Sequence, residues 1–137
     1  MNQTPSWRPI SDLPVVASIL DSMLHDDEGQ YRTLCECRPK PYVLDDHTVG
    51  RVIQVFTQQK ADLPLYQQQL SHWMEGDLPA SQKREVERLQ GCVSKLRELA
   101  ESILYLAEEL KQGTIESVFR KSDIELGLEF LQGRRKL

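Results

Sequence analysis

Long apolar runs are missing from this sequence. Nowhere do about 18 apolar residues follow one another, which is the length that a helix needs to span a bilayer. Residues 1–10 are polar, contain Pro5 and Pro9, and include no apolar stretch typical of a signal peptide. The sequence therefore predicts neither a membrane anchor nor export, and we expect no membrane partner.

Cysteine is also scarce. The chain has three cysteines, Cys35, Cys37 and Cys92, and an odd number does not fit the paired framework of a secreted disulfide-rich domain. Free thiols persist in a reducing compartment, so the composition indicates a cytoplasmic protein. Cys35 and Cys37 form a Cys-x-Cys pair, but zinc sites take about four ligands in pairs spaced by roughly two to four residues. We expect structural thiols here, with a metal or redox role as the minor alternative.

An excess of positive charge is absent as well. The chain carries 17 Lys and Arg against 21 Asp and Glu, a net charge of −4. A general nucleic-acid binder needs a basic surface that attracts phosphates. Arg134, Arg135 and Lys136 are too few to supply one, so we interpret residues 133–137 as a frayed basic tail. No nucleic acid is expected among the partners.

Motifs that carry chemistry are missing too. The seven glycines are scattered singly, so there is no phosphate-binding loop. His72 and Glu75 are three residues apart, but a di-iron bundle needs Glu-x-x-His pairs and the chain has none. Glu98 and Glu101 form a Glu-x-x-Glu pair like those that hold magnesium in helical pyrophosphohydrolases, yet the heptad phase described below turns both toward solvent. We predict no catalytic site, no metal site and no cofactor.

The remaining composition is that of one globular domain. With 137 residues, 39% of them hydrophobic and 28% charged, the chain buries roughly two-thirds of its unfolded surface on folding. We expect residues 1–137 to form a single helical domain in which residues 1–10 are a flexible N-terminus.

The clearest periodic pattern lies in residues 80–112. Apolar residues recur there in alternating steps of three and four, an unbroken a/d heptad over four repeats. They are Val86, Leu89, Val93, Leu96, Ala100, Ile103, Ala107 and Leu110. Cys92, Leu99 and Leu106 widen the stripe, which favours a globular bundle over a two-stranded coiled coil. Gly113 is expected to end the helix in the left-handed conformation.

Residues 46–75 repeat the same period, and only Gln59 interrupts it. The apolar a and d positions are Val49, Val52, Phe56, Leu63, Tyr66, Leu70 and Trp73. The connection at Gly76 and Asp77 is very short, and short connections make long helices antiparallel neighbours. The predicted fold class is therefore all-α: a helical bundle built on a long antiparallel helical hairpin, 46–75 with 80–112, with shorter helices at both ends.

The tripeptide Asp-Leu-Pro occurs at residues 12–14, 62–64 and 77–79. Aspartate accepts hydrogen bonds from the free amides of a first helical turn, and proline lacks an amide that this turn does not use. We interpret all three copies as helix starts, so the middle copy predicts a kink or a break near Ala61. The heptad phase continues past Pro64, which favours the kink.

The segments outside the hairpin are less regular. Residues 11–38 carry a helical pattern with a break expected at Gly29, and Asp45 or Asp46 is expected to cap the helix over residues 46–75. Thr114 is expected to cap a short helix that reaches about Phe119.

Residues 123–132 combine a capping-box pattern with the alternation of a strand. The capping box favours a helix over these residues, and a strand is the alternative.

One surface on the helix over residues 46–75 is a candidate contact surface. Its outward c and f positions are rich in glutamine and carry one permanent charge. They are Arg51, Gln54, Gln58, Ala61, Leu65, Gln68 and His72. Interface centres are depleted in charge because charge is costly to desolvate. The alternatives are cover by residues 11–38 of the same chain, and plain exposure to solvent.

These observations predict a non-enzymatic helical protein–protein interaction module, such as an adaptor, assembly factor or regulatory subunit. Its partner would be another protein or a second copy in a homodimer. The alternative is a small helical metal-dependent enzyme or ligand-binding protein that uses Glu98, Glu101 and His72, or the cysteines.

Overall fold

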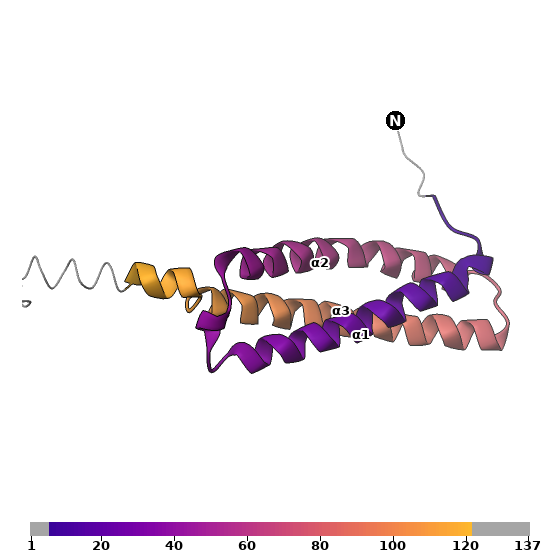
Figure 1. The fold of residues 1–137 in the computed structure, drawn as a ribbon. Helices are drawn as coiled ribbons and strands as arrows, with labels where there is room; N and C mark the ends of the chain where they lie inside the picture. Colours follow the sequence, from indigo (N-terminus) through magenta and orange to yellow (C-terminus); the bar gives the residue numbers. More distant parts are fainter. Residues whose placement is uncertain (1–5, 122–137) are drawn as a thin grey trace, which may run out of the picture.

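The structure is a computed structural model that describes residues 6–121, and within that range it is an all-α helical bundle without a strand (Figure 1). Its elements are η1 (Ile10–Asp12), α1 (Leu13–Cys37), η2 (Pro41–Val43), α2 (Asp46–Glu75) and α3 (Ala80–Lys111). Residues 115–121 form a further helical segment. The predicted fold class is confirmed, and the question of helix or strand over residues 123–132 lies outside the described residues.

α2 and α3 lie side by side and run in opposite directions, joined by residues 76–79 (Figure 1). Val49 near the start of α2 shares a buried cluster with Leu110 near the end of α3, and Trp73 at the other end of α2 shares one with Val86. All eight a and d positions predicted for α3 are buried. The heptad pattern therefore identifies the buried face of α3.

α1 is shorter than α2 and α3, as expected, but it lacks the break expected within it. It has 25 residues, packs along α3, and continues through Gly29 without the expected break. A glycine inside a helix costs about 1 kcal/mol relative to alanine. Leu34, one and a half turns beyond Gly29, is buried in the core, and that burial favours continuing the helix.

The core consists of two apolar clusters. The first contains the buried residues Leu13, Val16, Leu20, Leu63, Leu70, Trp73, Val86, Leu89, Cys92, Val93 and Leu96. The second contains Leu34, Val49, Val52, Phe56, Ala100, Ile103, Leu106, Ala107 and Leu110. On α1, Asp27 lies between the residues of the first cluster and those of the second, and Gln59 has the same place on α2. The two side chains are hydrogen-bonded to each other.

The Asp-Leu-Pro interpretation is correct for the positions of two helix starts but wrong for the capping. α1 begins at Leu13 and α3 begins at Ala80, directly after Pro79, yet neither start has a side-chain capping bond. Asp12 instead accepts a hydrogen bond from Arg8 Nη1 at 3.2 Å. Asp45 does cap α2, because its carboxylate accepts from the Thr48 amide at 2.7 Å.

The middle copy of Asp-Leu-Pro is not a helix start. α2 is continuous over its 30 residues with Pro64 inside it, so no loop interrupts the helix. A proline in a helix interior removes one hydrogen bond and costs about 3 kcal/mol. Leu63 and Leu70 on either side are almost fully buried against the core, and this burial holds the helix together through the proline.

The N-terminal segment packs on α2 at Trp7 and Arg8, which departs from the flexibility expected for these two residues; residues 1–5 of that expected flexible segment lie outside the described residues. The Arg8 amide donates to Gln69 Oε1 at 2.8 Å, and Trp73 Nε1 donates to the Arg8 carbonyl at 2.9 Å. The Trp7 ring stacks on His72 with 4.2 Å between ring centroids. The aromatic residues therefore fix residues 7 and 8, which polar composition alone did not predict.

Gly113 lies just after α3, which ends at Lys111, and packing rather than the expected left-handed conformation requires glycine there. Its backbone is not left-handed; instead, a Cβ atom at this position would lie 2.5 Å from Pro41 Cγ. Glycine thus permits the chain after α3 to pass close to η2. The Gly113 amide still satisfies the helix end by donating to the Leu110 carbonyl at 3.0 Å.

Candidate interaction surface

The predicted contact stripe lies on the outer side of α2. Six of its members are exposed within the described chain: Arg51, Gln54, Gln58, Ala61, Leu65 and Gln68. Leu65 is 64% exposed although it is a large apolar residue. α1 does not cover this stripe, so the alternative of cover by residues 11–38 does not hold. We call these six residues the α2 stripe.

His72, the seventh predicted member, is less exposed than the six residues of the α2 stripe. The stacked Trp7 ring leaves it only partly exposed. Glu75, its partner in the metal-site alternative, lies exposed in the last turn of α2 and lines a small hollow with Trp7 and His72. Among the described residues, no second carboxylate or imidazole and no thiol lines this hollow.

Glu98 and Glu101 lie together on the outer face of α3, exposed as the heptad phase predicted. Both line a shallow groove with Tyr31 and Glu109, of about 630 Å³. Lys60 approaches Glu101 at 3.5 Å. Across residues 6–121 there is no group of three or more His, Cys, Asp or Glu side chains that could hold a metal ion.

The three cysteines are free thiols. Cys35 and Cys37 are partly buried in the last turn of α1 and pack against the second apolar cluster. Cys92 is buried in the first cluster, where burial raises the pKa of its thiol. Apolar packing accounts for the positions of all three side chains.

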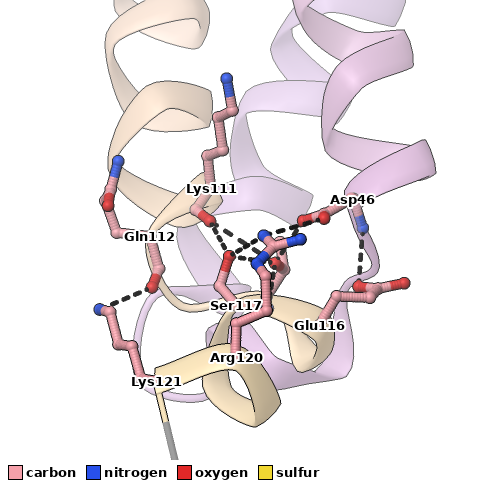
Figure 2. A network of polar contacts seen from close by, with 8 residues as sticks. Asp46, Lys111, Gln112, Glu116, Ser117, Arg120 and Lys121 are labelled. Carbon is pink, nitrogen blue, oxygen red and sulfur yellow. Dashed lines mark hydrogen bonds and ion pairs between the residues drawn. The ribbon is translucent and has the colours of Figure 1, made fainter. Parts of the chain in front are cut away.

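A polar network joins the chain after α3 to the start of α2 (Figure 2). Thr114 Oγ1 donates to Asp46 Oδ1 at 2.6 Å, and the Ser117 amide donates back to Thr114 Oγ1 at 3.3 Å, the helix cap expected from the sequence. Arg120 Nη2 reaches the second carboxylate oxygen of Asp46 at 3.2 Å. Glu116 accepts from the Asp46 amide at 3.0 Å. We call this network the latch.

The latch is buried at its centre and charged at its rim. Thr114 is fully buried, and Ser117 is nearly so. The hydrogen bond from Thr114 lowers the pKa of the Asp46 carboxyl, and the Arg120 guanidinium lowers it further. Backbone contact supports the same connection, because the Ile115 amide donates to the Leu44 carbonyl at 3.0 Å. The latch therefore sets the direction in which residues 115–121 leave the bundle.

A second exposed surface lies beside the latch, and sequence analysis missed it. Ile115, Val118 and Phe119 lie on the helical segment that projects beyond α2, and Tyr42 and Val43 lie on η2 (Figure 1). Phe119 is 64% exposed. The spacing of residues 115, 118 and 119 is that of one helical face, so the pattern was readable. We call these five residues the end patch.

Asp27 and Gln59 form a polar pair inside the bundle. Asp27 is 4% exposed, and one of its oxygens accepts a hydrogen bond from Gln59 Nε2. Burial raises the pKa of the Asp27 carboxyl, and the negative charge of Asp26 adds to the rise, while the Gln59 hydrogen bond opposes it. The heptad of α2 is interrupted at Gln59, but no local pattern pairs this residue with Asp27, 32 residues away.

Comparison of the chain with protein-family models, with curated proteins and with solved structures finds no match. Between residues 6 and 121 no helix combines the length and the apolar composition that crossing a membrane requires.

Proposed function

We propose that this protein is a non-enzymatic helical interaction module that acts as an adaptor, assembly factor or regulatory subunit through the α2 stripe. The observation that carries the proposal is the exposure of that stripe, with Leu65 unburied amid glutamines. A long helix normally turns charged side chains toward water. A nearly uncharged, partly apolar stripe instead resembles the centre of an interface in composition.

The partner that the stripe fits best is a second copy of this chain. Arg51 is its only permanent charge, at one end, so two stripes laid antiparallel bring no like charges together. The three free thiols support a reducing location such as the cytoplasm.

Native mass spectrometry and analytical ultracentrifugation of the full chain test the proposal. The expected result is a concentration-dependent dimer. The double variant Gln58→Glu with Leu65→Lys should weaken it at least about tenfold, because it forces two charges into the contact. The matched control is Ser94→Glu with Tyr105→Lys, the same charge change on exposed positions of α3.

Two outcomes would overturn this proposal. A strict monomer at every concentration removes the second copy as the partner. A dimer that the stripe variant leaves intact moves the contact elsewhere. The variant Phe119→Glu then reports whether that contact is the end patch.

A further inference from the structure

We infer that residues 123–132 of this same chain bind to the end patch and cover it. The five large apolar side chains of the end patch are each between 40% and 64% exposed among the described residues. An exposed apolar surface rimmed by polar residues is typical of a place where another segment or protein binds. The inference concerns a surface that the proposed function does not use, so it goes beyond that function and is independent of it.

Backbone contacts hold the two parts of the end patch together. The Ile115 amide donates to the carbonyl of Leu44, the residue after Val43, at 3.0 Å. Gly113 lies against the Pro41 ring at the start of η2. The latch adds polar contacts to the same connection (Figure 2). The end patch is therefore a formed surface, which a further segment can cover without rearranging the bundle.

The chain itself brings a further segment to this surface. Lys121, the last described residue, follows Phe119 of the end patch by two positions. A stretch of about ten residues spans about 15 Å as a helix and about 33 Å when extended. Residues 123–132 are therefore long enough to run back over residues 115–121, which span about 10 Å as a helix. Because the tether is short, their effective concentration at the end patch is on the order of millimolar.

The sequence of residues 123–132 has an apolar face of its own in either regular conformation. The apolar residues are Ile124, Leu126, Leu128, Phe130 and Leu131. The first four of them would share one face of a strand, and the first, third and fifth would share one face of a helix. Burying such a face against the end patch removes apolar surface from water on both sides of the contact.

Charge also matches the segment to the end patch. Residues 123–132 contain no basic residue and three acidic ones, Asp123, Glu125 and Glu129. Lys40 and Lys121 flank the end patch in the sequence, are exposed, and form no ion pair among residues 6–121. The Asp46 carboxylate beside the end patch is already paired with Arg120. The carboxylates of the segment therefore complement the two lysines at the rim.

Fluorine NMR of the full-length protein labelled with 4-fluorophenylalanine tests the inference. The chain has three phenylalanines, namely Phe56 in the core, Phe119 in the end patch and Phe130 in the segment. The shift of each fluorine signal between H2O and D2O reports how far that ring is exposed to solvent. We expect the shift of Phe119 to lie close to that of buried Phe56 and far from its own value in urea.

Leu128→Glu should move the Phe119 shift most of the way to its value in urea, because the variant places a charge in an apolar contact. Leu137→Glu, the same change outside the segment, is the matched control and should leave the shift unchanged. An unchanged Phe56 signal shows in each variant that the core remains folded.

Three outcomes would overturn the inference. The first is a wild-type Phe119 shift close to its value in urea, which means that the end patch is bare. The second is a Phe119 ring that stays protected in Leu128→Glu. The third is protection that disappears when the wild type is diluted, which assigns the cover to a second copy. Self-association through the α2 stripe is measured separately, so the proposed function and this inference can fail independently.

Discussion

The two ends of the bundle differ in how α1 is held. At the end that contains η1, Leu13, Val16 and Leu20 of α1 are buried with residues of α2 and α3. At the opposite end α1 contributes one buried apolar residue, Leu34, to a cluster made almost wholly by α2 and α3. The polar pair Asp27 and Gln59 lies at the boundary. Apolar burial thus fixes the first half of α1, whereas its second half has fewer anchors and should open more easily.

The largest effect is expected from truncating the buried leucines of α1. Leu20→Ala should lower the free energy of unfolding by about 3–5 kcal/mol, since this side chain is 0% exposed and packs among all three helices. Leu34→Ala should lower the free energy of unfolding by only about 2 kcal/mol, because the second half of α1 has fewer buried residues and can shift to fill the cavity. Urea denaturation measures both. Equal losses would break the comparison between the two ends.

Pro64→Ala should have the next largest effect and should stabilise the protein by about 1–3 kcal/mol. Pro64 is exposed, so the change removes no core contact and restores the amide that the helix lacks. Pro14→Ala is the matched control, because Pro14 lies in the first turn of α1, where the missing amide has no helical partner. A thermal melt that moves equally in both variants would contradict this account.

The latch stabilises the end of the bundle opposite η1. Removing its central hydroxyl therefore tests whether that end depends on polar contacts more than the η1 end does. Thr114→Val should destabilise the protein by about 1–2 kcal/mol, because Asp46 and the Ser117 amide both lose a buried partner. Hydrogen exchange should rise at residues 115–121 and at the start of α2, and not around η1. Ser94→Ala, which removes an exposed hydroxyl of α3, is the control.

The smallest effect concerns the boundary itself and depends on pH. Burial raises the pKa of Asp27 in the folded state, so the folded protein binds this proton more tightly than the unfolded chain does. The contribution of Asp27 to stability is therefore largest below its unfolded pKa and declines as pH rises through its folded pKa. Asp27→Asn should gain stability relative to the wild type as the pH rises above the unfolded pKa of Asp27, whereas Asp77→Asn should show no such trend.

Local patterns predicted the helices well where one helix face determines burial. The heptads identified the buried residues of α3 and all six buried residues of α2, because a period of about 3.6 residues aligns apolar side chains on one face. Single glycine and proline residues predicted helix breaks less reliably. Gly29 and Pro64 both lie inside continuous helices, since the burial of Leu34 and Leu63 outweighs the local cost.

The contacts between distant segments could not be predicted in the same way. The pairing of Asp27 with Gln59 joins residues on two helices whose relative register no local pattern states. The latch likewise joins Asp46 to Thr114, 68 positions apart. The stacking of Trp7 on His72 removed one residue from the predicted stripe by the same kind of long-range contact. Positions on a helix face were thus readable, whereas partners across the bundle were not.

The odd number of long helices between residues 6 and 121 has a mechanical consequence. Because α1 and α3 point the same way, residue 6 and residue 121 lie at opposite ends of the bundle (Figure 1). At about 1.5 Å per residue, the 32 residues of α3 span about 48 Å. A load applied between those two points would pull α1 and α3 past each other along their length. Many side-chain contacts would have to slide at once, rather than separate one after another as in a hairpin pulled from its open end.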